Sequence, residues 1–245
     1  MSAQAYFDAA AAGLEKLRAE QLGNIETAAE MLTEAITAGH TIFAFGATHS
    51  FILPMELCYR TGGLMLVNAI YPHGMDLQVR PMPLTSQIER VAGYGRLLLE
   101  NSPAVAGDAL IIASTSGRNA VVIDMAMAAQ EAGLGVIGIT SVEYSMNVPS
   151  RHPTGKRMLD FCDIVIDNCA PLGDAAVKVE GVEQKTGPLS TVLGVTVVNA
   201  IACQTVANLV ARGIEPPIYI SANIPGGDEH NARLLAENAD RIHYM

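Results

Sequence analysis

Short apolar runs alternate along the chain with longer stretches of helical periodicity. Apolar residues recur at helical spacing most clearly through Val122, Met125, Ala126 and Ala129. Strands that alternate with helices form parallel sheets with helices packed on both faces. The pattern therefore predicts an α/β fold, a three-layer α/β/α sandwich around a parallel sheet. The continuous apolar runs predict buried strands at residues 41–45, 64–67, 109–113, 134–140 and 164–166.

The two ends of the chain read as helical. Residues 3–38 are rich in Ala, Leu and Glu and predict one long helix, or two helices broken at Gly23 and Asn24. We expect residues 1–38 to form an arm that packs on the core or on a second subunit, and residues 39–245 to form one domain. A long apolar helix is expected at 189–211, and a last helix after Gly226 and Gly227.

The middle of the chain adds shorter elements. Helices are predicted at 51–60 and 156–161, and a third is predicted to start at Thr85 or Ser86, with Glu89 in its first turn, and to continue to about residue 101. Residues 168–188 read as a long loop that lines or covers a site.

Three hydroxyls and a glycine join the strand at 109–113 to the helix after it. The first N–H groups of a helix lack internal partners and carry partial positive charge, so a phosphate can be held there by amides and hydroxyls together. A plain alternative is that Ser116 is an ordinary N-cap and the other hydroxyls only satisfy the turn. The residues of this turn are Ser114, Thr115, Ser116 and Gly117, and Arg118 and Asn119 after them can add a charge and a donor.

A second turn of the same kind follows the first predicted strand. Gly46 permits a tight turn, His49 lies within it and Ser50 can cap the next helix. The spacing is not the G-x-G-x-x-G of a dinucleotide fold, so no NAD is expected. Ser190 and Thr191 supply further hydroxyls where the late apolar helix begins. Turns at the carboxyl ends of parallel strands face one crevice, where open α/β sheets bind ligands.

The three hydroxyl-bearing turns together resemble those of the SIS (sugar isomerase) family. The resemblance covers about residues 39–213, and its most specific part is the turn at 114–117. It implies a five-stranded parallel sheet of flavodoxin-like, Rossmann-like type, dimers or tetramers, and phosphorylated sugars bound in clefts shared between subunits. Segments 49–63 and 226–231 further resemble an uncharacterised, phosphoheptose-isomerase-like branch of single-domain SIS proteins.

Isomerisation of an aldose to a ketose through an enediol needs a base and an acid. Glu56, in the helix after the first turn, is the expected base, since the resemblance implies a glutamate near this helix. His49 can contact a sugar hydroxyl or transfer a proton. His230 is the expected acid for ring opening, by chain position in some family isomerases. The expected sugar and phosphate ligands are Gly46, Ser50, Ser114, Thr115, Ser116, Gly117, Arg118, Asn119, Ser190 and Thr191.

Three activities stay open from the sequence. The first is a sugar-phosphate isomerase, the second a lyase or etherase acting on such a sugar, and the third a module that senses the sugar without turning it over. The lack of a DNA-binding helix-turn-helix before the SIS region favours an enzyme.

Charge and composition narrow the partners. A formal net charge of −10 argues against nucleic acid and against an anionic membrane surface. The four cysteines form no C-x-x-C pair, which favours free thiols in a reducing cytoplasm. No signal peptide and no membrane-spanning apolar run is expected. Although His73 and Asp76 join His49 and His230 as possible ligands, no pair has metal-binding helical spacing, so neither a metal nor another cofactor is expected.

Overall fold

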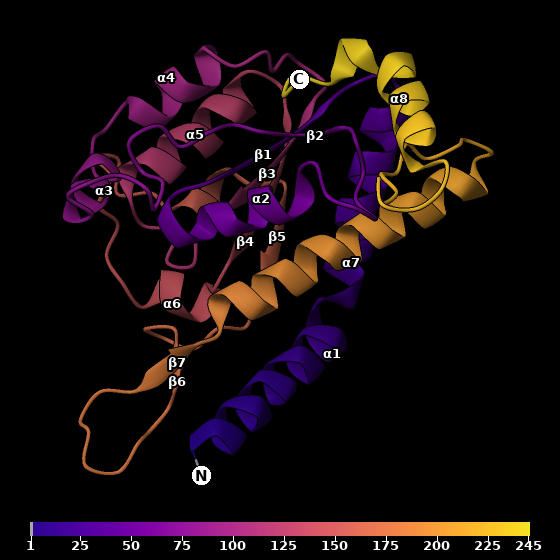
Figure 1. Ribbon diagram of the computed structural model, residues 1–245. Helices are drawn as coiled ribbons and strands as arrows, with labels where there is room; N and C mark the ends of the chain where they lie inside the picture. Colours follow the sequence, from indigo (N-terminus) through magenta and orange to yellow (C-terminus); the bar gives the residue numbers. More distant parts are fainter. Residues whose placement is uncertain (1) are drawn as a thin grey trace.

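The computed structural model describes residues 2–245 and has a five-stranded sheet at its centre (Figure 1). All of its neighbouring strands pair in parallel, in the order β2-β1-β3-β4-β5. The predicted three-layer sandwich with a five-stranded parallel sheet is confirmed. The strands are β1 (Ile42–Gly46), β2 (Val67–Ala69), β3 (Ala109–Ala113), β4 (Gly135–Thr140) and β5 (Ile164–Asp167).

Alternate residues of the central strands enter two different cores. Ile42 of β1 and Ile111 of β3 face the layer made by α1 (Ser2–Thr37), α2 (Ile52–Leu57) and α7 (Ser190–Ala211). Phe43 and Leu110, the next positions, face the layer made by α4 (Tyr94–Glu100) and α5 (Ala120–Glu131). This two-sided burial explains why the strands are continuous apolar runs rather than alternating ones.

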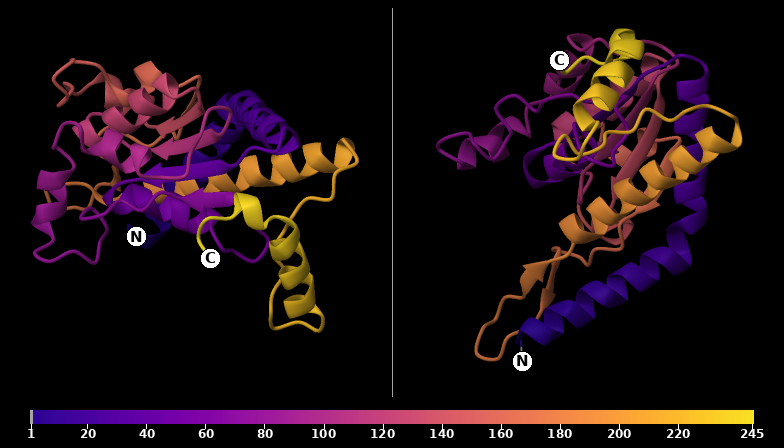
Figure 2. Two further views of the ribbon diagram at one scale, coloured as in Figure 1. Left: turned by 90° about the horizontal axis from the view of Figure 1, so that it is seen from above. Right: turned by 45° about the vertical axis from the view of Figure 1, so that its right-hand side comes forward.

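Helix α1 is one continuous helix, without the break considered at Gly23 and Asn24. Its buried residues begin at Leu17, and its carboxyl half packs on α7 and the sheet. Its amino half extends beyond the sheet beside a small antiparallel hairpin (Figure 2). The hydroxyl of Tyr6 donates to the carbonyl of Pro188 at 3.0 Å and ties the two together.

That hairpin lies within the long loop expected at 168–188. Its strands are β6 (Ala175–Val177) and β7 (Thr186–Pro188). The predicted site loop is therefore an ordered element that reaches from β5 to the first turn of α7.

Several predicted boundaries are wrong for local reasons. The helix expected at 51–60 is a 3-10 turn, η1 (Thr48–Phe51), followed by the short α2. The second strand lies later than 64–67, because Leu64 instead forms a bridge with Ile218. The helix expected to continue to 101 is split into α3 (Pro83–Ile88) and α4, since Gly93 adopts a positive φ of 86°.

The other helices are α6 (Val142–Met146) and α8 (Gly227–Glu237), with two further 3-10 turns, η2 (Met158–Phe161) and η3 (Ala239–Arg241). Helix α7 is long and apolar enough, by length and composition alone, to cross a membrane. Leu193, Val197 and Ile201 of this helix lie in the core of the fold, as in the central helices of water-soluble proteins.

Candidate functional site

A cleft of about 410 Å³ opens at the carboxyl ends of β1 and β3. It brings together most of the side chains that the sequence singled out. Those are His49, Ser50, Ser114, Thr115, Ser116, Asn119, Ser190 and Thr191. The cleft is also lined by residues that the sequence did not assign to a site: Glu89, Tyr144 and Asp174. A recess of about 20 Å³, room for one water molecule, shares Ser50, Ser114 and Thr191 with the cleft and is also lined by apolar side chains such as Leu53 and Ile139.

The turn after β3 leaves two of its three hydroxyls, those of Thr115 and Ser116, available to a ligand. Helix α5 begins only at Ala120, with Asn119 as its N-cap residue, so Ser116 is not the cap that the plain alternative required. Gly117 adopts a positive φ of 58°, and its N–H donates to Ser114 Oγ at 3.2 Å. Within residues 2–245, the hydroxyls of Thr115 and Ser116 make no hydrogen bond.

The turn after β1 is tight enough to require glycine. A Cβ on Gly46 would lie 2.5 Å from the carbonyl oxygen of Ser50, so no other residue fits without moving the turn. Thr48 adopts a positive φ of 53°, a strained conformation of the kind found at binding sites. Ser50 does not cap a helix as expected; its N–H donates to the carbonyl of Ala47, and its side chain lines the cleft beside His49.

The N-terminus of α7 is already partnered by a carboxylate from the hairpin. Asp174 Oδ1 accepts hydrogen bonds from the N–H groups of Leu189 at 3.0 Å and Ser190 at 2.7 Å. Its Oδ2 accepts the Ser190 hydroxyl at 2.6 Å. Because an anion already occupies this helix end, the Ser190 hydroxyl is less available to a phosphate than the sequence suggested, whereas Thr191 still lines the cleft.

Glu89 is the carboxylate that the sequence analysis missed. It follows α3, its carbonyl accepts the N–H of Val121 at 3.1 Å, and its Oε2 accepts Asn119 Nδ2 at 2.6 Å. Burial raises the pKa of Glu89 above its ordinary value, and the bond from Asn119 and the charge of Arg90 lower it in part. The sequence signal at Glu89 indicates only the start of a helix, because Glu89 lies three residues after Ser86.

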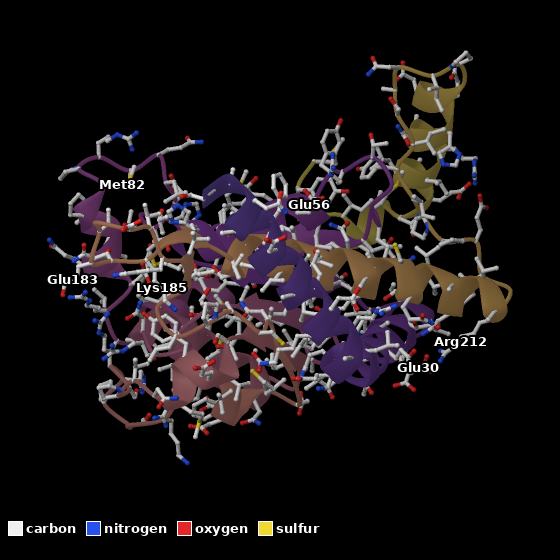
Figure 3. All side chains as sticks on the ribbon, turned by 90° about the horizontal axis from the view of Figure 1, so that it is seen from below. Glu30, Glu56, Met82, Glu183, Lys185 and Arg212 are labelled. Carbon is white, nitrogen blue, oxygen red and sulfur yellow. The ribbon has the colours of Figure 1, made fainter. Side chains whose placement is uncertain are left out.

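Two of the three expected catalytic residues lie outside this cleft. The carboxylate of Glu56 accepts hydrogen bonds from Arg60 Nε and Asn199 Nδ2, each at 3.2 Å, between α2 and α7 (Figure 3). His230 Nε2 donates to the carbonyl of Ile218 at 3.2 Å and sits on α8, at the other end of α7 from the hairpin (Figure 1). Of the three, His49 lines the cleft.

Three expected phosphate ligands support the cleft rather than line it. Gly46 and Gly117 shape the two turns, as described above. Arg118 lies behind the turn after β3, where its carbonyl accepts the N–H of Arg151 at 2.8 Å.

The four cysteines are free thiols. Burial raises the pKa of Cys58 and of Cys162 to about 12, and that of Cys169 to about 11. Cys203 is exposed on α7. Within residues 2–245 no group of three or more His, Cys, Asp and Glu side chains is arranged to hold a metal ion.

The fold and the position of the cleft define an α/β protein of the sugar-isomerase type, and comparison with known proteins agrees. The SIS domain model matches residues 5–141, more than half of the chain, so the chain belongs to the SIS domain family. The match begins within α1 and includes the turns after β1 and β3.

Close relatives span nearly the whole chain. A UPF0309 protein of Shouchella clausii is 44% identical over 218 residues, covering 89% of each chain. A UPF0309 protein of Streptomyces griseus is 43% identical over 240 residues, covering 98% of this chain and 96% of its own.

Solved structures share the fold at low identity. Phosphoheptose isomerase of Neisseria gonorrhoeae superposes with a TM-score of 0.55 at 15% identity, over 84% of this chain and 97% of its own. The sugar isomerase domain of an RpiR transcription factor from Sphaerobacter thermophilus gives 0.51 at 16% identity, over 98% and 97%.

Proposed function

We propose that the cleft binds a phosphorylated sugar and that the protein is an aldose–ketose sugar-phosphate isomerase. The observation that carries this proposal is the convergence of unpaired hydroxyls from the turns after β1 and β3 on one cleft that also holds a carboxylate of raised pKa. Family membership supports the ligand class, as does the likeness of the fold to phosphoheptose isomerase.

The phosphate would lie against the turn after β3. Among the described residues the hydroxyls of Thr115 and Ser116 have no partners, and Ser50 approaches from the turn after β1. Hydroxyl and amide donors hold a phosphate without bringing a full positive charge into the site. Asp174 at the start of α7 repels a phosphate from that side and can accept a sugar hydroxyl instead.

Glu89 is the first candidate for the base. Its Oε2 is held by Asn119, which leaves Oε1 to take the proton from the carbon beside the sugar carbonyl. The electron pair of that C–H bond forms the C=C bond of the enediol, and the carbonyl oxygen receives a proton. The hydroxyl on the carbon that lost its hydrogen then gives up its proton to form the new carbonyl, while the former carbonyl carbon takes the proton back from the base, which completes the isomerisation. A pKa raised toward neutrality suits a general base. His49 is the candidate that moves protons at oxygen.

Glu56 stays a second candidate base. It lies two turns of chain beyond Ser50, in a position that a sugar extending along α2 and α7 would meet. His230 stays the candidate acid only if a neighbouring subunit delivers it, because in its own chain it lies at the far end of α7. We accordingly propose a homodimer or homotetramer with clefts shared between subunits, in the cytoplasm; light scattering on the purified protein tests the assembly.

The competing functions are a lyase or etherase and a non-catalytic sensor. Likeness to the sugar isomerase domain of a transcription factor favours the sensor as second choice. Incubation of the protein with a panel of aldose and ketose phosphates in D₂O separates the three by NMR. An isomerase incorporates deuterium at the carbon next to the carbonyl and interconverts the two sugars. A lyase releases a fragment, and a sensor changes neither, although it binds.

A further inference from the structure

Three arginines lie near one another just outside the cleft, in a chain whose net charge is −10. They are Arg90, which follows Glu89, Arg118, which follows the turn after β3, and Arg151, in the loop between α6 and η2. Within residues 2–245 none of the three lies within 4.0 Å of a carboxylate oxygen, whereas Arg18, Arg60, Arg96, Arg212 and Arg233 all do. Arg80, Arg157 and Arg241 have no carboxylate partner in that range either, but their guanidinium groups donate to backbone carbonyls.

Arg151 joins this cluster to the wall of the cleft. Its Nη1 donates to Asn119 Oδ1 at 3.0 Å, and its backbone N–H donates to the carbonyl of Arg118 at 2.8 Å. Asn119 and Tyr144, which lie next to it, both line the cleft. The guanidinium group of Arg151 therefore stands next to the wall of the cleft, behind Asn119, without lining the cleft itself.

The positive charges of the cluster are close enough to affect one another. The pKa of Arg151 is lowered by desolvation and then by the charges of Arg118 and Arg90. Arg118 also has a buried Nε with no hydrogen-bond partner within residues 2–245. The carboxylate beside them is Glu89: its charge raises the pKa of Arg151 in part, and the charges of Arg90 and Arg151 lower that of Glu89. Glu89 therefore offsets part of the positive charge, although it lies more than 4.0 Å from all three guanidinium groups.

A buried contact between a histidine and a carboxylate fixes the loop that carries Arg151. His152 Nε2 lies 3.0 Å from Asp124 Oδ1, with each side chain only 5% exposed, and its Nδ1 lies 2.7 Å from Thr154 Oγ1. Asp124 Oδ2 also accepts the N–H of Gly93 at 2.6 Å. Because the fold already orders this loop, an anion that meets Arg151 does not have to order it first.

We propose that Arg90, Arg118 and Arg151 form a second anion subsite, so that the substrate is a sugar phosphate carrying a further phosphate or carboxylate group. The first phosphate lies in the cleft, on the turn after β3, and the second group lies just outside it, at Arg151, which is bonded to the cleft-lining Asn119 at 3.0 Å. The cleft itself, at about 410 Å³, is within the usual size of small-molecule sites. Arginine is well suited to both groups, since its fork of donors matches phosphate and carboxylate oxygens. The proposal rests on the proposed function, because the first phosphate defines the orientation of the sugar.

Calorimetric titration with three matched probes tests this subsite: a hexose 6-phosphate, the corresponding hexose 1,6-bisphosphate and the corresponding 6-phospho sugar acid. The wild type should bind one or both doubly anionic probes about tenfold or more tightly than the monophosphate, since hydrogen bonds to charged groups are the stronger ones. Comparison of the affinities for the bisphosphate and the sugar acid shows whether the arginines prefer a phosphate or a carboxylate.

Arg151→Gln should lower the affinity for the preferred doubly anionic probe about tenfold and leave the affinity for the monophosphate nearly unchanged. Arg18→Gln, an exposed arginine on α1 far from the cleft, removes the same charge and should change neither. If Arg151→Gln lowers the melting temperature of the free protein, Arg90→Gln, at an exposed position, replaces it in the titration.

Equal wild-type affinity for all three probes would overturn the subsite, and so would an equal loss for all three in Arg151→Gln. In both cases Ser116→Ala decides whether the proposed function survives. If the single phosphate still binds and needs Ser116, only the subsite fails; if no probe binds in a way that needs Ser116, the proposed function fails with it.

Discussion

Two groups of polar residues lie at the same edge of the sheet, yet the protein uses them in opposite ways. After β4 and β5, the Ser141 hydroxyl donates to the carbonyl of Ala170 at 2.6 Å, and Asp167 Oδ1 accepts the N–H groups of Val142 and Cys169. After β1 and β3, the hydroxyls of Ser50, Thr115 and Ser116 have no such partners within residues 2–245 and face the cleft.

The difference teaches how to separate structural from functional polar residues. A buried polar group must find a partner, and Ser141, fully buried, finds one inside the fold. A hydroxyl that stays unpaired at the wall of a cleft costs the fold little, because water satisfies it until a ligand arrives. Residue type alone does not tell the two uses apart; their hydrogen bonds do.

The largest expected effect is on catalysis in the cleft, beside the turns after β1 and β3. Glu89→Gln keeps the shape of the side chain and can still accept from Asn119, but it cannot take a proton. We expect turnover of the sugar phosphate to fall by about 10²–10⁴-fold with little change in affinity. Glu56→Gln is the matched variant on α2. If it abolishes turnover while Glu89→Gln does not, the base lies between α2 and α7.

The next effect compares the two groups of polar residues by their contribution to the free energy of unfolding. Ser141→Ala leaves the carbonyl of Ala170 without its buried partner and should lower the free energy of unfolding by about 1–3 kcal/mol. Ser116→Ala removes a hydroxyl that has no partner within residues 2–245, and it should change the free energy of unfolding by less than about 0.5 kcal/mol. Urea unfolding of both variants measures the contrast. Equal losses would mean that Ser116 also has a structural role.

A smaller effect follows from the pKa of Glu89. Because burial raises the folded-state pKa of this carboxyl, its protonation favours the folded state. That stabilisation is fully present below the unfolded-state pKa and is lost as the pH rises through the folded-state value. Glu89→Gln has no carboxyl to ionise and does not lose this stability, so its melting temperature should exceed that of the wild type at pH 7. The difference in melting temperature should disappear toward pH 4. A gap that does not change with pH would contradict the burial of this charge.

The smallest effect concerns the thiols. Cys203 is exposed, whereas burial raises the pKa of Cys58 and Cys162 to about 12. A thiol reagent at pH 8 should therefore modify Cys203 first and the other cysteines slowly, with all four reacting after denaturation. Mass spectrometry of Cys203→Ala beside the wild type counts the labels. Fast labelling of the variant would show that the core opens readily.

The sequence was most informative where one physical requirement dominates. The strand at 109–113 was predicted with its observed bounds, since a strand buried on both faces must be a continuous apolar run. The cleft was foreseen in outline for a related reason: parallel strands bring the turns after β1 and β3 to one edge.

The rest depends on contacts between distant segments. Glu89 reaches the cleft because the positive φ of Gly93 separates α3 from α4, and because the N–H of Val121 donates to the carbonyl of Glu89. Glu56 sits on a helix of six residues, and its spacing from Ser50 did not reveal that it faces α7. Asp174 lay in a segment read as a loop, so its bond to the start of α7 had no pattern in the sequence.

The most direct test of the central claim is a thermal-shift screen of phosphorylated sugars and their unphosphorylated counterparts, with Ser116→Ala beside the wild type. A ligand that binds only the folded state raises its melting temperature. We predict that a phosphorylated sugar stabilises the wild type, that its unphosphorylated counterpart does not, and that Ser116→Ala loses most of the shift. No shift with any sugar phosphate, or equal shifts with and without phosphate, would contradict the assignment of the turn after β3 as a phosphate site.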